Sequence, residues 1–264
     1  MGFDEFLREV ASVLGLQWRP FQRRGVKRKI ERRIAEIGLS DFEEYLLVVE
    51  KNPQERKHLS KILTVTISRF FRDKEVFETL SQSVIPVLLK EDRKELRIWS
   101  VGCASGEEPY SFSILWKEKF EKAWPQVRLS VLATDIDETM LERAREGKYR
   151  KSSLKEMPEE TLVNFFKTPN GFYVIDSAIR ESVEFKRHDI LHDQPFSRMD
   201  MVFCRNLAFT YFSKESQMEV LREIALSLKE KGYLVIGKDE FIPLTYPTLF
   251  VPVFLKEKIY QKFT

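Results

Sequence analysis

From Arg97 onward, segments typical of β-strands alternate with segments typical of helices. The expected elements are strands at 97–102, 128–134, 183–187, 200–205 and 232–237, and helices at 107–121, 138–147 and 214–229. This alternation predicts an α/β fold with a doubly wound, mostly parallel sheet. Two extended segments, 249–255 and 257–263, would add an antiparallel edge. The interval 150–184 interrupts the alternation with prolines and glycine, and it is expected to be an insertion with a short strand at 171–175.

Residues 1–73 have helical periodicity instead, with apolar side chains three and four residues apart. Helices are expected over 26–37, from a cap at Ser40, and over 55–63. Another helix, 74–89, leads into a charged turn. We therefore expect an N-terminal helical domain at 1–73, a linker helix and turn at 74–96, and a cofactor-binding domain at 97–264 that carries the insertion at about 150–184.

Composition is that of an ordinary soluble protein of 264 residues, with 43% hydrophobic and 32% charged residues. The apolar runs are far shorter than a membrane span, and the N-terminus lacks the apolar centre of a secretory signal. A cytoplasmic location is therefore expected. The two cysteines, Cys103 and Cys204, have no paired spacing, and the three histidines are scattered, so no metal site is expected.

Net charge is only +3, yet eight of the fifteen residues from Arg19 to Arg33 are Lys or Arg, and only Glu31 among them is acidic. A run of charge is usually a solvated helix face. The alternative is a docking surface for an acidic partner, either a protein helix or a nucleic-acid backbone. For such a surface the residues of choice are Arg24, Arg28 and Arg32.

A glycine turn follows the first strand of the sheet, at Gly102 and Gly106, and opens a helix. Glycines let backbone N–H groups approach a ligand closely, and a helix N-terminus carries partial positive charge. Glu107 and Glu108 in the first helical turn would repel phosphate. They favour a ligand with a cationic amino-acid tail, such as S-adenosylmethionine.

Polar residues also follow the other strands, where an open parallel sheet gathers its ligands. Asp135, after the second strand, could accept both hydroxyls of a ribose, whereas Asp137 is expected to cap the next helix. His188-Asp189-Ile190 offers a carboxylate, a backbone and an apolar side chain suited to adenine. Cys204-Arg205-Asn206 offers polar groups toward the same edge of the sheet.

Four motifs together resemble the CheR family of chemotaxis receptor methyltransferases. They are Gly102-Cys-Ala-Ser-Gly-Glu-Glu-Pro-Tyr110, Ala133-Thr-Asp-Ile-Asp137, Phe203-Cys-Arg-Asn206 with a downstream Tyr-Phe, and Phe70-Phe-Arg-Asp73. The resemblance implies an S-adenosylmethionine-dependent methyltransferase fold with a small antiparallel β-subdomain and an N-terminal all-helical domain. It implies methyl transfer to glutamate side chains of a receptor, with S-adenosylhomocysteine as the product.

Carried over position by position, the resemblance implies roles for particular residues. The cofactor contacts would be Thr66, Ser68, Arg72, Gly102, Gly106, Glu107, Asp135, Asp189, Ile190, Arg205 and Asn206. Arg72 would also hold the substrate carboxylate, and Tyr211 would line the path of the methyl group. Thr66 and Ser68 stand where the family usually has Asn and Thr. One extra residue precedes Tyr211, and Gly237-Lys-Asp-Glu240 replaces the usual Gly-His-Ser-Glu.

The reaction requires no general base, because a carboxylate is already a nucleophile at neutral pH and a sulfonium is an activated leaving group. Catalysis is expected to come from alignment and desolvation. The partner would be the acidic helical region of a chemoreceptor or a similar signalling protein. One alternative is a cofactor-binding regulatory protein without transfer activity. A nucleic-acid methyltransferase is disfavoured, since Cys204-Arg-Asn206 stands where an Asn/Asp-Pro-Pro-aromatic element would be needed.

Overall fold

The computed structural model describes residues 1–16, 25–63, 68–90, 93–245 and 247–263. Its internal contacts divide the chain into two compact units. The helical unit comprises residues 1–66 and 210–217, and the sheet unit comprises residues 67–209 and 218–264. The short segment 210–217 therefore groups with the N-terminal residues, although it follows the fourth strand of the sheet in sequence.

The helical unit contains α1 (Phe3–Val13), α2 (Val26–Glu36), α3 (Phe42–Lys51) and α4 (Pro53–Leu63). Apolar side chains at helical spacing, among them Phe6, Ile30 and Leu59, are fully buried in its core. The cap of α3 is Asp41 and not Ser40 as expected. Asp41 has the extended backbone of a cap, and its carboxylate accepts the N–H of Glu43 at 2.8 Å.

A buried polar contact ties three helices of this unit together. The Glu55 carboxylate accepts two hydrogen bonds from the Arg33 guanidinium, at 2.8 and 2.7 Å, and one from the Tyr45 hydroxyl at 2.8 Å. The Arg33 pair holds the pKa of Glu55 below its ordinary value. Arg33 therefore stabilises the fold, whereas Arg28 and Arg32 lie on the face of α2 opposite its buried residues and are exposed.

The sheet unit is built on seven strands in the order β6-β2-β1-β7-β8-β10-β9. Their bounds are β1 (Glu95–Val101), β2 (Arg128–Asp135), β6 (Val183–Arg187), β7 (Met199–Cys204), β8 (Leu228–Ile236), β9 (Phe250–Phe254) and β10 (Ile259–Lys262). The first five in this order pair in parallel, and β10 pairs antiparallel with both β8 and β9. The doubly wound fold and its antiparallel edge are thus confirmed.

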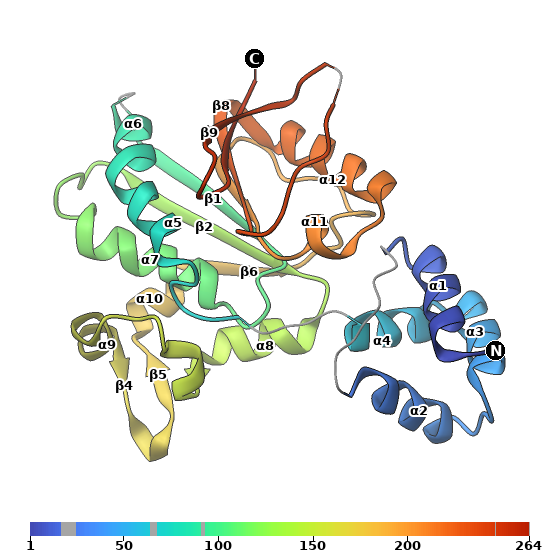
Figure 1. Cartoon of the computed structure of the whole chain (residues 1–264). Coiled ribbons are helices and arrows are strands. Elements are labelled where there is room, and N and C mark those ends of the chain that lie inside the picture. Colours follow the sequence, from blue (N-terminus) through green and yellow to red (C-terminus); the bar gives the residue numbers. More distant parts are fainter. Residues whose placement is uncertain (17–24, 64–67, 91–92, 246, 264) are drawn as a thin grey trace. The chain divides into compact units, whose positions relative to one another are not determined.

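Helices cover the sheet on both sides, as Figure 1 shows for α7 and α12. The helical segments of this unit are α5 (Lys74–Thr79), the π-helix η1 (Leu80–Val84), α6 (Ile85–Leu89), α7 (Glu107–Lys119), α8 (Glu138–Glu146), η2 (Lys151–Leu154), α9 (Glu159–Phe165), η3 (Pro169–Gly171) and α10 (Ser177–Glu181). Two more helices, α11 (Ala208–Tyr211) and α12 (Lys214–Ser227), have residues in both units. Helix α7 buries apolar residues such as Phe112 and Ile114 in the main core.

The small antiparallel sheet is also confirmed, in the order β3-β5-β4. Its strands are β3 (Lys148–Tyr149), β4 (Phe166–Lys167) and β5 (Tyr173–Ile175), so it begins just before the expected interval. Phe70 packs edge-on against Tyr149 and Phe166, with ring centroids 4.8 and 5.2 Å apart. This contact joins the Phe70-Phe-Arg-Asp73 segment to the small sheet.

No helix in the described part of the chain has both the length and the apolar character needed to cross a membrane. Across the same residues, no group of three or more His, Cys, Asp or Glu side chains is arranged to hold a metal ion. Cys103 and Cys204 are free and buried. Burial raises the pKa of both thiols, which keeps them protonated and poorly reactive.

Candidate active site

The turn between β1 and α7 has the conformation that its glycines permit. Gly102 has φ +69° and Gly106 has φ +88°, in the left-handed region that favours glycine. A Cβ atom added at Gly102 would come within 2.5 Å of the Leu207 side chain. Gly106 directly precedes α7, so Glu107 and Glu108 are its first two residues.

Glu107 is buried, with 3% of its surface exposed. Its carboxylate accepts hydrogen bonds from the hydroxyls of Ser105, at 3.1 and 3.0 Å, and Ser153, at 3.3 Å. Among the residues that the structure describes, no cationic side chain forms an ion pair with it. Burial raises the pKa of Glu107, because a charged carboxylate has lost its water without gaining a counterion. The site therefore lacks one positive charge.

Glu108, its neighbour in sequence, is differently placed. Its carboxylate accepts a hydrogen bond from the Ser100 hydroxyl at 2.7 Å and pairs with the Arg205 guanidinium at 3.3 Å. Burial raises its pKa, while the positive charges of Arg205 and Arg72 act in the opposite direction. Arg205 is thus the counterion of Glu108, whereas Glu107 has no counterion among the described residues.

Asp135 ends β2 and faces the glycine turn. One carboxylate oxygen accepts the N–H of Ala104 at 2.9 Å, and the other accepts the N–H of Asp137 at 2.8 Å. Each oxygen keeps a second lone pair, so the carboxylate could still accept two hydroxyl protons. Burial raises its pKa. Asp137 caps α8, as expected, by accepting the N–H of Thr139 at 3.1 Å.

The predicted adenine contacts lie beyond the next strand end. The backbone N–H of His188 donates to the Asp135 carbonyl at 3.1 Å, which holds this loop beside the end of β2. The Asp189 carboxylate accepts the N–H of Leu191 at 3.0 Å and contacts the ring of His192 at 2.9 Å. Ile190 is buried, with 6% of its surface exposed. The Asp189 carboxylate therefore stabilises the loop by contacts with residues of the loop itself.

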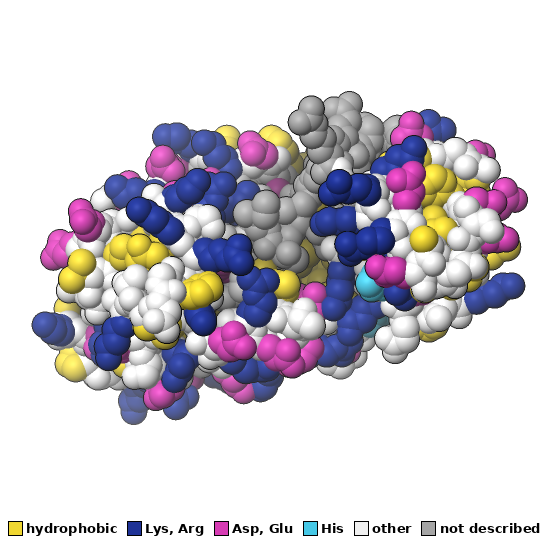
Figure 2. Space-filling model, turned by 90° about the horizontal axis from the view of Figure 1, so that it is seen from below, with side chains coloured by type: hydrophobic (Ala, Val, Ile, Leu, Met, Phe, Trp, Pro, Cys, Tyr) yellow, Lys and Arg dark blue, Asp and Glu magenta, His cyan; other side chains and the backbone are white. Residues whose placement is uncertain are grey.

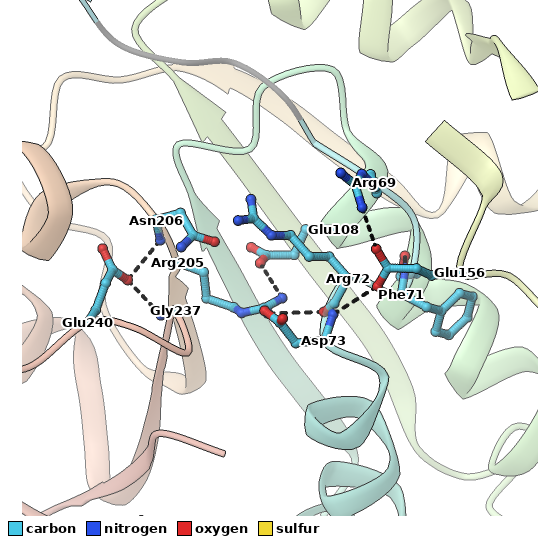
Figure 3. Close-up of polar contacts among 11 residues, drawn as sticks. Arg69, Phe71, Arg72, Asp73, Glu108, Glu156, Arg205, Asn206, Gly237 and Glu240 are labelled. Carbon is cyan, nitrogen blue, oxygen red and sulfur yellow. Dashed lines mark hydrogen bonds and ion pairs between the residues drawn. The ribbon is translucent and has the colours of Figure 1, made fainter. Parts of the chain in front are cut away.

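Arg205 and Asn206 follow β7, and Figure 3 shows Arg205 pointing toward Arg72, Asp73 and Glu108. Arg205 donates to the Arg72 carbonyl at 3.0 Å and to the Asp73 carboxylate at 2.5 Å. Asn206 has φ +57°, an uncommon conformation for a residue with a side chain. Its N–H donates to the buried carboxylate of Glu240 at 2.8 Å.

Arg72 follows two residues that the protein holds in place by burial and by backbone hydrogen bonds. Phe70 and Phe71 are buried, and their N–H groups donate to the Ser153 carbonyl at 2.9 Å and the Ser111 hydroxyl at 2.8 Å. The Arg72 guanidinium is half-buried and forms no hydrogen bond or ion pair with any described residue. Ser68, also half-buried, directs a hydrogen bond to Glu107 that acts to lower its pKa.

The remaining predicted residues belong to the helical unit or lie outside the described residues. Tyr211 is buried with 7% exposure in the hydrophobic core of the helical unit. Arg28 and Arg32 are exposed on α2, where Figure 2 shows Lys and Arg side chains gathered on the helical unit. Thr66 and Arg24 lie outside the described residues.

Sequence reasoning assigned no role to several residues that shape this site. Ser153 supports Glu107 from 46 positions away, and no local pattern predicts that contact. Asp73 is the last residue of the Phe70-Phe-Arg-Asp73 motif, and its place in that motif could have identified it as a site residue. Glu240 accepts hydrogen bonds from two backbone N–H groups, but nothing in the local sequence distinguishes it from an ordinary acidic residue of a turn.

The site is suited to a ligand that has a cation at one end and hydroxyls nearby. Glu107 is a buried carboxylate without a counterion, and the Ala104 and Gly106 backbone forms a turn beside it. Asp135 has free lone pairs next to the same turn. An ammonium group would relieve the desolvation of Glu107, and a ribose would suit Asp135. The residues present thus fit S-adenosylmethionine.

Comparisons with known proteins point to the same ligand. The family model described as CheR methyltransferase, SAM binding domain, matches residues 66–259, and the model of the CheR all-alpha domain matches residues 1–64. A chemotaxis protein methyltransferase of Listeria innocua is 32% identical over 237 residues, which cover 90% of this chain and 88% of that protein. One of Salmonella typhimurium is 33% identical over 255 residues, covering 90% and 84%.

A further relative is much longer than this chain. An uncharacterised 104.1 kDa protein of Rhodobacter capsulatus is 36% identical over 219 residues. The match covers 81% of this chain but only 23% of that protein.

Proposed function

Because this chain belongs to the CheR methyltransferase family, with residues 66–259 as its S-adenosylmethionine-binding domain, we propose that it methylates glutamate side chains of a chemoreceptor or a similar signalling protein. The relatives from Listeria and Salmonella, both named chemotaxis protein methyltransferases, support this choice of substrate. In this role the protein would act in the cytoplasm.

The observation that carries the proposal is the buried, uncompensated carboxylate of Glu107. A buried charge without a partner is costly, so a protein keeps one where a ligand supplies the counterion. Glu107 would hold the ammonium group of the cofactor, and Asp135 would accept its ribose hydroxyls. Asp189, Ile190, Arg205 and Asn206 would shape the remaining wall of the cofactor site.

Bound S-adenosylmethionine supplies an activated methyl group, so the protein's own residues need only orient and desolvate the acceptor. The Arg72 guanidinium forms no hydrogen bond or ion pair with a described residue and would pair with the substrate carboxylate. A glutamate is ionised at neutral pH, and no general base is required to make it a nucleophile. Tyr211 as an aromatic lining of the methyl path remains a prediction.

The substrate would be recognised through α2, whose exposed Arg28 and Arg32 lie on one face four residues apart. Arg28 forms no ion pair with any described residue, and Arg32 pairs with Glu36 at 3.2 Å at the surface. A surface pair of this kind is weak and can be exchanged for an acidic residue of a partner. An acidic receptor helix is the proposed partner of this face.

The test is to incubate the protein with radiolabelled S-adenosylmethionine and receptor cytoplasmic fragments, then release the label with base. Base-labile label on a fragment is expected, since a glutamyl methyl ester hydrolyses readily. Tight cofactor binding without label on any fragment would favour a regulatory protein without transfer activity. The extra residue before Tyr211 is the sequence feature that favours this alternative. In a parallel incubation with nucleic acid, label on the nucleic acid would contradict the proposed acceptor.

A further inference from the structure

We propose that Asp73 is a positioning residue that holds Arg72 in place through Arg205. The inference rests on the proposed function of Arg72 as the group that pairs with the substrate carboxylate. It extends that proposal to a residue that contacts neither reactant, and it assigns the Arg205 side chain to the support of Arg72.

The contacts form a continuous chain of hydrogen bonds. The Asp73 carboxylate accepts from Arg205 Nη2 at 2.5 Å, and the same nitrogen donates to the Arg72 carbonyl at 3.0 Å. Arg205 Nη1 lies 3.3 Å from the Glu108 carboxylate. Only 3% of the Arg205 side chain and 24% of the Asp73 side chain are exposed. Arg205 is thus held by two carboxylates and in turn holds the backbone of Arg72.

The backbone around Arg72 explains why such support is needed. Phe71 has φ +52° and Asp73 has φ +57°, both in the left-handed region that residues with side chains rarely adopt. Each such conformation costs free energy and persists only where the surroundings impose it. Arg72 therefore stands between two strained residues, and its direction depends on the contacts that keep them in that conformation.

The segment would keep its place in the fold without the Asp73 carboxylate, because other anchors remain. Phe71 N–H donates to the Ser111 hydroxyl at 2.8 Å, and Asp73 N–H donates to the Glu156 carboxylate at 3.2 Å. These are backbone contacts that a side-chain substitution leaves in place. Loss of the Asp73 charge would weaken one of the two ion pairs that hold Arg205 and, with it, the contact to the Arg72 carbonyl.

The experiment compares Asp73→Asn with Lys74→Gln as a matched control. Lys74 is the next residue and pairs with Glu78 at 3.1 Å, but its side chain is 61% exposed and forms no hydrogen bond or ion pair with Arg72 or Arg205. Asp73→Asn is expected to lower kcat for receptor methylation by about ten- to a hundredfold. Affinity for S-adenosylhomocysteine should fall by a smaller factor than kcat, and Lys74→Gln should change neither quantity.

A double-mutant cycle then tests whether Asp73 acts through Arg72. In an Arg72→Lys background the charge remains, but no planar guanidinium is left to orient. Asp73→Asn should there reduce kcat by less than twofold. An equal reduction in both backgrounds, or no reduction in either, would overturn the inference. Asp73→Ser serves as the second variant if thermal unfolding shows that Asp73→Asn does not fold.

Failure of the proposed function gives a different result. Arg72→Ala is expected to abolish most of the methyl transfer. If Arg72→Ala instead methylates the receptor at the wild-type rate, the role of Arg72 is wrong, whatever Asp73→Asn does. If Arg72→Ala is inactive but Asp73→Asn is normal, only the positioning role of Asp73 is wrong.

Discussion

The Glu240 carboxylate accepts the backbone N–H of Asn206 at 2.8 Å. The same oxygen accepts the N–H of Gly237 at 2.6 Å, so one buried side chain joins the residues that follow β7 and β8. Asn206 is kept at φ +57° by this contact. The altered Gly237-Lys-Asp-Glu240 turn therefore holds Asn206, a residue of the proposed cofactor site, by backbone hydrogen bonds.

Replacing Gly237 with Ala should weaken cofactor binding. An added Cβ atom would come within 2.5 Å of the Asn206 side-chain nitrogen and 2.7 Å of the Glu240 carboxylate, so one of them must move. We expect affinity for S-adenosylhomocysteine to fall by about tenfold, which calorimetric titration would measure. Gly2→Ala is the control, because an added Cβ atom there meets no atom within 4 Å and the backbone is extended. Unchanged affinity in Gly237→Ala would show that Asn206 need not be held there.

Replacing Glu107 with Gln should weaken the binding of S-adenosylhomocysteine and abolish the pH dependence of that binding. Burial raises the pKa of Glu107 above its ordinary value of 4.5, so protons compete with a cationic ligand in the pH range above 4.5. Affinity for S-adenosylhomocysteine should rise with pH through that range in the wild type. In Glu107→Gln it should be about 10- to 100-fold weaker at neutral pH and independent of pH.

The proton balance offers a second measurement on the same residue. Cation binding favours the ionised form of Glu107, so the wild type should release protons on binding, and heats measured in buffers of different ionisation enthalpy would detect them. Glu138→Gln, at the protein surface, is the control. Equal affinity of wild type and Glu107→Gln at every pH would show that the ammonium group is bound elsewhere.

Replacing Glu55 with Gln should destabilise the helical unit by about 2 kcal/mol at neutral pH, because Arg33 and Tyr45 lose a charged acceptor. Since Arg33 lowers the pKa of Glu55, the stabilisation is complete above pH 4.5 and is lost as pH falls through the lower folded pKa. The difference between wild type and Glu55→Gln should shrink accordingly. Hydrogen exchange of α2 and α4 amides measures it, with Glu50→Gln as an exposed control.

Reversing the charge of Arg28 and Arg32 should impair receptor recognition alone. Arg28→Glu with Arg32→Glu would repel an acidic helix, so the receptor KM should rise by about tenfold or more while cofactor affinity stays constant. The matched control reverses two exposed lysines of the sheet unit, Lys94 and Lys256. An equal loss of cofactor affinity and receptor methylation would contradict a docking role for α2.

The alternation of strands and helices was sufficient to predict the sheet and its antiparallel edge, because period and turn residues are local properties of the chain. Helix ends were predicted less well. Ser40 and Asp41 are both good caps by composition, and only the backbone conformation decides that Asp41 serves. The small sheet was predicted from the resemblance and a short run at 171–175, yet its first strand, β3, begins at Lys148.

The sequence by itself determined that a glycine turn with two glutamates meets a carboxylate at the ends of neighbouring parallel strands. Only the tertiary structure decided which glutamate is free to bind a cation. Glu107 and Glu108 differ by one position, but Arg205, 97 residues from Glu108, neutralises only the latter. Such pairings depend on strands brought together from distant parts of the chain, and charge compensation is therefore a property of the fold and not of the local sequence.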